Sequence, residues 1–308
     1  MSHDSQPTLP FQSAIHPEVL DCTHTIPFRC HPDIACFNAC CKQADVTLTP
    51  YDVIRLKHRL QLDSSAFLEQ YTVPFQMDSD GLPGIKLKTD NTGACLQLAG
   101  DSGCGVYSDR PTVCRYYPIA LLALKEKDAK TSKEQYSLIT EPHCLGHQTD
   151  RRIAIDDYRQ EQGVVEYDDM NRPWYQLILK KKSAGPSIGQ LPQPSLQLFF
   201  MACYDLDRFR RFVCSDNFRA TYQLPADFYA ELAQSDEELL QFGYRFLRQV
   251  LFGEHSIQEA ADAWEKRVEQ RREVWELRRQ LEIARRAAAE DAKYECASDA
   301  PNSSCQGD

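Results

Sequence analysis

The segment FRCHPDIACFNACC, from Phe28 to Cys41, constrains the fold of this chain more than any other stretch of its sequence. It carries four cysteines within twelve residues, and four more follow by residue 144, which accounts for eight of the thirteen cysteines in the chain. Thiolates are the soft anionic ligands that zinc and iron–sulfur clusters select. The sequence therefore predicts one or two sulfur-rich metal sites, with the ligands Cys30, Cys36, Cys40, Cys41, Cys95, Cys104, Cys114 and Cys144.

Composition limits the other functions that the chain can have. At 308 residues and 42% hydrophobic content, the chain can bury a core without help from metal or disulfides. Its net charge of −10 argues against generic binding to nucleic acid or to an anionic membrane. No secretory signal is apparent, and the longest apolar stretch, Ile119 to Leu124, is too short to span a membrane. We therefore expect a cytoplasmic protein, in which clustered cysteines bind metal more often than they form disulfides.

Two short helices are predicted directly after the first cysteine cluster. Thr49 is a good N-cap, Pro50 suits the first helical position, and Asp52 falls in the first turn. A second helix follows, with Asp63 or Ser64 as its cap. Its sequence, SSAFLEQY, lacks side chains that read base edges, so an ordinary αα-hairpin is favoured over a DNA-binding helix-turn-helix.

The segment that follows reads as a small β-hairpin region. Ile85 and Leu87 alternate with lysines, and the sequence DNTG at 90–93 supplies turn chemistry before Cys95. Glycines at 100, 103 and 105 bracket Cys104, and they allow a tight turn whose amides can point at sulfur. Residues 136–139 form a further predicted strand.

The remainder of the chain is helical in pattern, so the predicted fold class is α+β. We predict a flexible tail over 1–25, a cysteine-cluster metal-binding domain over 26–182 and a linker rich in Gly, Pro, Ser and Gln over 183–195. A helical domain over 196–254, a charged amphipathic helix over 255–292 and a disordered tail over 293–308 then follow. Apolar residues recur in that helix over fewer than three clean heptads. The helix could thus form a homodimer seam, dock a protein partner or pack on its own domain.

Residues close to the cysteines in sequence suggest how the negative charge of a thiolate site would be offset. Four thiolates around one zinc ion carry a net charge of about −2, and cationic side chains stand close by in sequence. Those side chains are Arg29, Lys42, Arg110 and Arg115, and their charge or N–H groups would temper the excess negative charge. Three histidines, His31, His143 and His147, are alternative ligands, although outer positions around the site are favoured for them.

Two signatures in this order resemble the YkgJ-like cysteine-cluster family, a family named for zinc or iron chelation. The first is FRC, five residues, Cys36 and then NACC. The second is GACLQLAGDSGCGVYSDRPTVCRYYP, in which Arg110, Pro111, Cys114, Arg115, Tyr117 and Pro118 match the family pattern. The resemblance covers roughly residues 26–148 and implies a metal-binding or iron–sulfur domain. A related branch, the flagellin lysine methylases, is similar in the first motif, which implies an iron–sulfur cluster and methyl transfer from S-adenosylmethionine. The chain has no glycine-rich nucleotide loop after a strand to support that chemistry.

These patterns converge on a metal-binding protein that holds an iron–sulfur cluster, zinc or iron. Crowded thiolates beside glycine amides favour the iron–sulfur cluster. Two alternatives stay open: an iron–sulfur methyltransferase or redox enzyme, and an interaction adaptor with structural zinc. No Ser-His-Asp order, paired catalytic carboxylates or phosphate loop stands out in the sequence, so whether the protein is an enzyme stays open.

Overall fold

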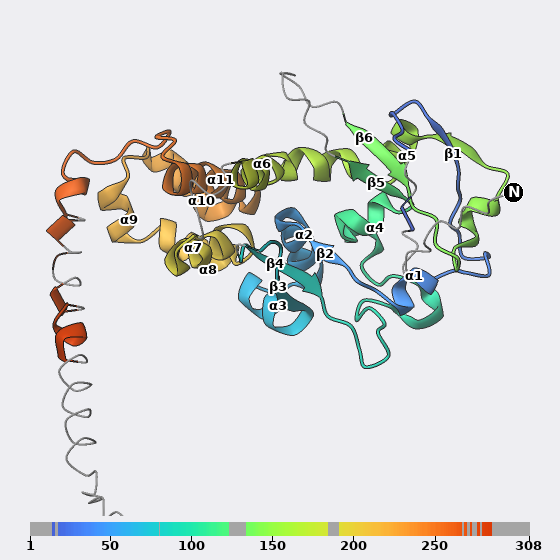
Figure 1. Ribbon diagram of the computed structural model, residues 1–308, viewed down its shortest axis with the longest axis horizontal. Coiled ribbons are helices and arrows are strands. Elements are labelled where there is room, and N and C mark those ends of the chain that lie inside the picture. Colours follow the sequence, from blue (N-terminus) through green and yellow to red (C-terminus); the bar gives the residue numbers. More distant parts are fainter. Residues whose placement is uncertain are drawn as a thin grey trace, which may run out of the picture. The chain divides into compact units, whose positions relative to one another are not determined.

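The protein is represented by a computed structural model, which divides into two compact units (Figure 1). The first unit runs to Ser215 and includes Pro225–Ile257, and the second comprises Asp216–Leu224 and the residues from Gln258 onward. The structure describes residues 14–15, 18–79, 81–122, 134–183, 191–266, 268–269, 272, 276–277 and 279–284. Within these residues, none of the helices combines the length and the apolar character needed to cross a membrane.

The first unit mixes helices with short strands. Its helices are α1 (Ala39–Lys42), α2 (Pro50–Leu60), α3 (Ser64–Tyr71), α4 (Thr112–Tyr116), α5 (Ile155–Glu161), α6 (Val164–Ser183), α7 (Gln193–Cys203), α8 (Leu206–Val213), α10 (Ala226–Gln234) and α11 (Asp236–Phe252). Its strands are β1 (Thr25–Pro27), β2 (Thr47–Leu48), β3 (Thr72–Gln76), β4 (Pro83–Leu87), β5 (Ile119–Leu122), β6 (Gln135–Leu138) and β7 (Arg152–Ala154). Three 3-10 helices complete it: η1 (Gly100–Ser102), η2 (Tyr107–Asp109) and η3 (Leu145–Gln148). The mixed composition and the helical C-terminal region agree with the predicted fold class.

Three small antiparallel sheets organise the strands. Their strand orders are β1-β7, β2-β4-β3 and β5-β6. The predicted β-hairpin does not form as expected. Strand β4 pairs with β3 and β2, and not with the segment after the DNTG turn. That segment forms isolated bridges instead, Thr89 with Cys95 and Leu98 with Cys104. The Asp90 carboxylate accepts the amides of Thr92 and Ala94, so the turn forms as predicted but no strand follows it.

Helix α2 begins as its sequence predicts and lies centrally in the first unit (Figure 1). The Thr49 side chain accepts the Asp52 amide, and Asp52 accepts the Thr49 amide, which completes a capping box ahead of Pro50. Its apolar face buries Val53 and Leu56 completely. The helix contacts α3, α6 and α11, so it joins the cysteine-bearing half to the C-terminal helices.

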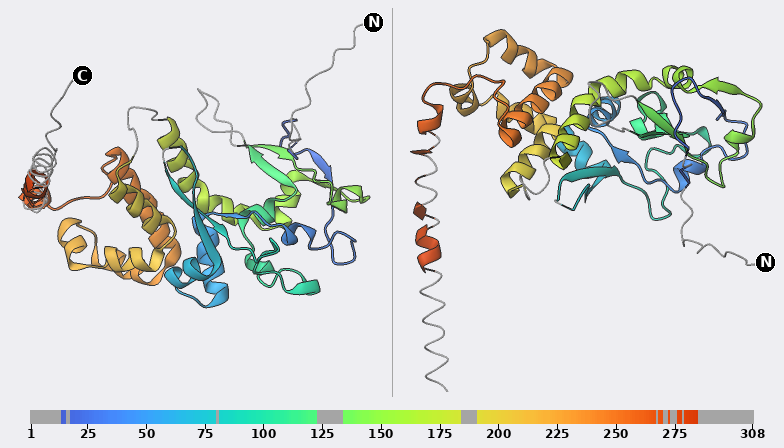
Figure 2. Two further views of the ribbon diagram at one scale, coloured as in Figure 1. Left: turned by 60° about the horizontal axis from the view of Figure 1, so that its bottom comes forward. Right: turned by 45° about the horizontal axis from the view of Figure 1, so that its top comes forward.

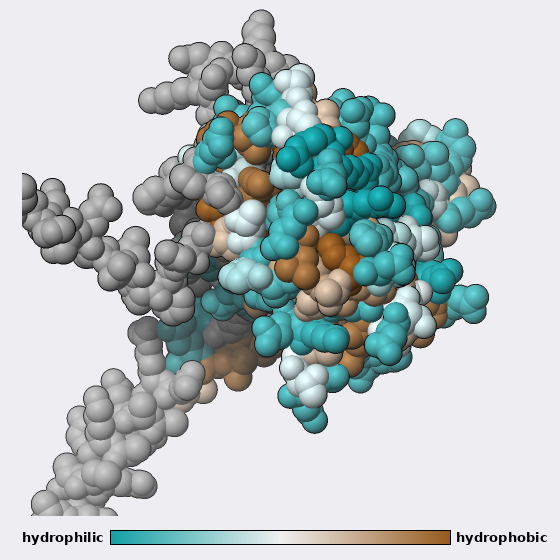
Figure 3. All heavy atoms as spheres, turned by 90° about the vertical axis from the view of Figure 1, so that its right-hand side faces the viewer, coloured by the Kyte–Doolittle hydropathy of each residue, from teal (hydrophilic) through white to brown (hydrophobic). Residues whose placement is uncertain are grey.

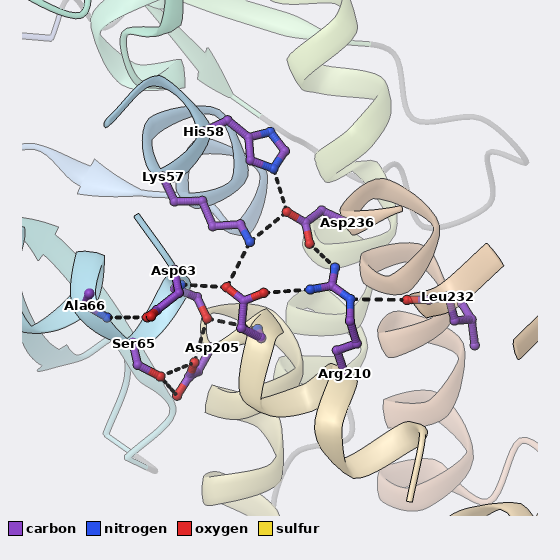
Figure 4. A network of polar contacts seen from close by, with 11 residues as sticks. Lys57, His58, Asp63, Ser65, Ala66, Asp205, Arg210, Leu232 and Asp236 are labelled. Carbon is purple, nitrogen blue, oxygen red and sulfur yellow. Dashed lines mark hydrogen bonds and ion pairs between the residues drawn. The ribbon is translucent and has the colours of Figure 1, made fainter. Parts of the chain in front are cut away.

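A buried charge network fixes the C-terminal end of α2 to α8 and α11 (Figure 4). The Lys57 ammonium lies 2.9 Å from Asp207 and 2.7 Å from Asp236, and all three residues have mostly buried side chains. Arg210 pairs with both carboxylates, and His58 Nε2 lies 2.7 Å from Asp236. Burial alone would raise the pKa of Asp207, but the Ser64 amide and Lys57 outweigh it and hold that pKa at about 2. The network is therefore charged and paired at neutral pH.

The C-terminal helices pack aromatic side chains against one another. Phe199, Tyr204, Phe209 and Phe242 are almost completely buried, and the Phe242 and Phe246 rings stack at 6.2 Å. The segment from Ala226 to Phe252 forms two helices, α10 and α11. Ser235 separates them, and its hydroxyl caps α11 by accepting the amide of Glu238.

The charged helix predicted over 255–292 does not begin at residue 255. Residues 254–262 are irregular. The buried Gln249 side chain accepts the amides of Ser256 and Ile257, which diverts those donors from a helical ladder. In the second unit, α9 (Asp216–Thr221) precedes Tyr222, which pairs with Glu259. Helical residues are described from Ala263, and much of the predicted seam lies outside the described residues. So do residues 184–190 of the linker predicted over 183–195, whose last three residues are part of α7 instead. The dimer and docking roles of the charged helix stay predictions.

Candidate metal centre

All eight predicted ligands lie in the first unit, on segments that are far apart in sequence. The residues up to Cys41 lie on and before α1, Cys95 and Cys104 flank η1, Cys114 is in α4, and Cys144 precedes η3. Each has a free thiol that is exposed or half-buried, whereas Cys203 is completely buried. Cysteine without a chemical role is among the most buried residue types. Burial as apolar thiols therefore accounts for Cys203 but not for the eight.

A first group of thiols forms where the loop after β1 meets the loop before η3. The Arg29 amide donates to Gly146 O at 3.1 Å, and the Leu145 amide donates to Cys36 Sγ at 3.2 Å. A Cβ on Gly146 would approach the Phe28 ring to 2.6 Å, so only glycine permits this close contact. The pKa of the Cys30 thiol is raised to about 11, chiefly by burial and further by the nearby thiols of Cys40, Cys36 and Cys144.

A second group forms around the other side of α1. The Cys95 amide donates to Cys41 O at 2.8 Å, which brings these two residues together across the fold. Desolvation raises the pKa of the Cys114 thiol, which keeps some contact with solvent, and the charges of Cys95 and Cys104 add to the effect. The pKa of Cys41 is raised by its hydrogen bond with Cys40, by burial and by the charges of Cys40, Cys114 and Cys104. These four thiols, those of Cys41, Cys95, Cys104 and Cys114, thus influence one another.

Backbone amides point at two of these sulfurs. Cys95 accepts a hydrogen bond from the Gln97 amide, and Cys104 accepts one from the Val106 amide. Burial raises the pKa of both thiols, and the amide bonds oppose that rise because they stabilise the thiolates. Gly103 has a φ of 93°, a conformation that favours glycine, and it allows the tight turn before Cys104. The turn has the form that its glycines predict.

Cys40 and Cys41 lie where the two groups meet. Their sulfur atoms are 4.0 Å apart, and the hydrogen bond between them lowers the pKa of Cys40 to about 7. Helix α1, which carries both, is tied to η1 by the Asn38 side-chain amide, which donates to Gly100 O at 3.4 Å. Adjacent side chains on this short helix can therefore serve neighbouring sites.

The predicted cationic neighbours divide into two roles. Burial dominates the raised pKa of both Cys30 and Cys104, and the charge of the buried Arg110 acts in the opposite direction on each. Arg115 instead holds the backbone: its guanidinium donates to Arg110 O at 3.0 Å and to Gln162 O at 2.8 Å. Arg29 and Lys42 are exposed. The sequence anticipated a charge role for Arg115, but the structure uses that residue to shape the loop between Cys104 and Cys114.

The three histidines lie beside the thiol groups rather than among them. His147 packs on the Phe28 ring at 5.2 Å, and burial lowers its pKa. His31 Nδ1 is 3.9 Å from Asp33, and His143 Nε2 is 3.5 Å from Glu141. Over the part of the chain that the structure describes, no three His, Cys, Asp or Glu side chains stand at metal-coordination geometry. The fold gathers the thiols, and their role as ligands remains a prediction.

Asp52 is a site-forming residue that sequence reasoning placed only in a helix cap. Its carboxylate is completely buried and also accepts the Thr112 amide at 2.8 Å and the Thr112 hydroxyl at 2.7 Å. These bonds hold the first turn of α4, the helix that carries Cys114. The sequence gives no local signal for this contact, because 60 residues separate the two partners. Asp52 therefore links the start of α2 to the second thiol group.

We expect Asp52→Asn to destabilise the protein by about 2–4 kcal/mol, because hydrogen bonds to a buried carboxylate are worth about 1.5–3 kcal/mol each and the amide NH₂ would face existing donors. Urea unfolding of the full chain measures this change. Asp101→Asn, at an exposed position in η1, is the matched control and should change stability by less than about 0.5 kcal/mol. Equal effects of the two substitutions would contradict the proposed anchoring role of Asp52.

Comparison with known proteins locates this domain within the chain. No curated protein and no solved structure matches the sequence. A protein-family model, named CxxCxxCC, matches residues 29–144, which include all eight cysteines described above. This chain has five and three residues between its first three cysteines, rather than the two and two of the family name. Residues 29–144 nevertheless match the model of this family, whose description is "putative zinc- or iron-chelating domain".

Proposed function

We propose that the first unit binds metal through two sets of four thiolates. The first set is Cys30, Cys36, Cys40 and Cys144, and the second is Cys41, Cys95, Cys104 and Cys114. The observation that carries this proposal is the meeting of the two groups at Cys40 and Cys41, whose sulfurs are 4.0 Å apart on one helix. A hydrogen bond from a backbone amide supports each set. In the first set the Leu145 amide donates to Cys36 Sγ, and in the second the Cys95 amide donates to Cys41 O.

An iron–sulfur cluster is the group that the surroundings favour over zinc. Amides of Leu145, Gln97 and Val106 donate to cysteine sulfurs, and hydrogen bonds to sulfur tune such clusters. Gln97 Nε2 is a buried polar atom that has no hydrogen-bond partner among the described residues, and the Tyr117 hydroxyl lies within hydrogen-bonding reach of Cys144 and Glu141. Burial raises the pKa of Tyr117, and the neighbouring Cys144 and Glu141 raise it further. Its hydroxyl is thus a protonated donor placed beside a proposed ligand.

Four cysteine ligands per site limit the chemistry. A metal with four protein ligands has no open position for a substrate, so such a site serves structure or electron transfer rather than Lewis-acid catalysis. Exposure of Cys30, Cys40 and Cys114 favours electron transfer over a purely structural role, because exposed ligands place the cluster near a partner's reach. A redox protein is accordingly the second candidate function. Methyl transfer is the further enzyme alternative, and binding of S-adenosylmethionine to the metal-loaded protein is the observation that it requires.

Purification without oxygen, followed by measurement of iron, acid-labile sulfide and zinc, tests the proposal. We expect iron and sulfide in equal amounts and visible absorbance that bleaches reversibly on reduction. Zinc at about two ions per chain, without sulfide, would favour the structural-zinc adaptor instead. Less than one equivalent of any metal, with all thiols open to titration, would refute metal binding.

A further inference from the structure

The β3–β4 hairpin lies beside α7 in the first unit, where β4 contacts that helix (Figure 2). A groove that no cysteine lines lies between them. Its volume is about 800 Å³, within the range of about 300–1,000 Å³ that small-molecule sites occupy. Phe75, Leu198, Phe200 and Met201 give it apolar walls. Polar side chains share the lining: Gln76, Gln193 and Gln197. Met201 adds an adaptable surface, because its side chain is flexible and polarizable.

One charge faces this groove. Arg208, at the start of α8, is the only charged residue among the described residues that line it. Its guanidinium is exposed and makes no hydrogen bond or ion pair within the described part of the chain. The next arginine of the helix, Arg210, is fully engaged with Asp207 and Asp236. Arg208 is therefore available to an anion from outside the protein.

The edge of the hairpin argues against a peptide that adds as a strand. The Lys88 amide donates to Tyr71 O, and the Met77 amide donates to Leu82 O. The odd-numbered residues of β3 therefore point their backbone N–H and C=O groups toward β4. The even-numbered residues point their backbone groups to the open edge of the sheet. There the Thr72 amide already donates to Leu68 O, and Pro74 has no N–H. Only Gln76 is left to donate from this edge. Such an edge disfavours strand addition, so the groove suits a small molecule.

We propose that this groove binds an organic anion with an apolar body and one acidic head group, which Arg208 pairs. Apolar walls would take the body, and the planar guanidinium would take a carboxylate or sulfonate. This site is independent of the proposed metal function, because it shares no lining residue with the thiol groups.

The probe for the test is anilinonaphthalene sulfonate, whose aromatic body and single anionic group match the proposed class. Its binding to the full chain is followed by fluorescence titration, together with that of phenylnaphthylamine, which has no charge. We expect Arg208→Gln to weaken sulfonate binding at least about fivefold, the effect of losing roughly 1 kcal/mol of ion pairing, and to leave the neutral probe unaffected. Dodecanoate should compete with both probes.

Arg211→Gln is the matched control, since Arg211 is an exposed arginine of the same helix that does not line the groove. It should change binding less than twofold. Leu198→Trp, which fills the groove, should abolish binding of both probes while circular dichroism stays unchanged. Equal effects of the two arginine substitutions, persistent binding in Leu198→Trp, or no binding to the wild-type chain would each overturn the proposal.

Discussion

Replacing Cys41 by serine should remove about half of the bound metal, and replacing Cys40 should remove the other half. The two residues are adjacent, but their surroundings differ. The Cys41 carbonyl accepts the Cys95 amide, and its thiol is influenced by Cys104 and Cys114. Cys40 raises the pKa of Cys30 in the first group, as well as the pKa values of the thiols in the second. Loss of one of four ligands should empty its own site and leave the other site loaded. Metal and sulfide per chain, measured after anaerobic purification, report the outcome.

Double substitutions separate two sites from one. Cys41→Ser combined with Cys114→Ser should lose no more metal than Cys41→Ser alone, because both residues belong to the same site. Cys41→Ser combined with Cys30→Ser should lose all of it, because effects at independent sites add. Cys22→Ser, at an exposed cysteine outside both sets, is the control and should keep the full content. If either single variant loses everything, the eight thiols form a single shared site.

Lys57→Met should destabilise the first unit by about 3 kcal/mol or more. The substitution keeps the apolar stem but removes the ammonium that lies between Asp207 and Asp236, and breaking a buried pair from one side costs about 3–5 kcal/mol. Arg210 still contacts both carboxylates, which places the expected value at the lower end of this range. The midpoint of urea unfolding, converted to a free energy, measures the loss.

His58→Gln provides the comparison for the same network. His58 contacts Asp236 from a side chain that is 54% exposed, so its replacement should cost less than about 1 kcal/mol. Metal content should survive both changes at temperatures where the protein stays folded, because neither residue touches a cysteine. A Lys57→Met protein as stable as the wild type would mean that Arg210 alone satisfies the two carboxylates.

The outer surface gives a different view of the cysteine-bearing end of the first unit. The face at the β1 end is mostly hydrophilic, with small hydrophobic patches between polar side chains (Figure 3). Charged and polar residues near thiolates keep this end in water, and exposed Cys30 lies just beyond β1. Iron–sulfur or zinc ligation would thus take place near the surface rather than in the hydrophobic core.

Sequence reasoning succeeded where the deciding contacts are local. Thr49, Pro50 and Asp52 specify the start of α2 because cap and first turn satisfy each other's backbone groups within four residues. The glycines around Cys104 specify a turn because the backbone conformation of a turn is also a local property, as the φ of 93° at Gly103 shows. It failed for β4, whose predicted partner lay after the DNTG turn, because short strands of similar pattern do not reveal which edge they join. It also began the charged helix too early, because nothing local shows that Gln249 captures the next two amides.

The sequence alone predicts that this chain offers thiol ligands to a metal. Softness as a ligand is a property of cysteine itself, and the crowding of eight cysteines between residues 30 and 144 is visible in the sequence. The sequence also carries the two signatures that lie within residues 29–144, the range that the family model matches. Only the tertiary structure decided how Asp52 reaches Thr112 across 60 residues and how Lys57 reaches Asp207 across 150. Contacts of that range depend on the packing of whole helices, and no local pattern in the sequence encodes them.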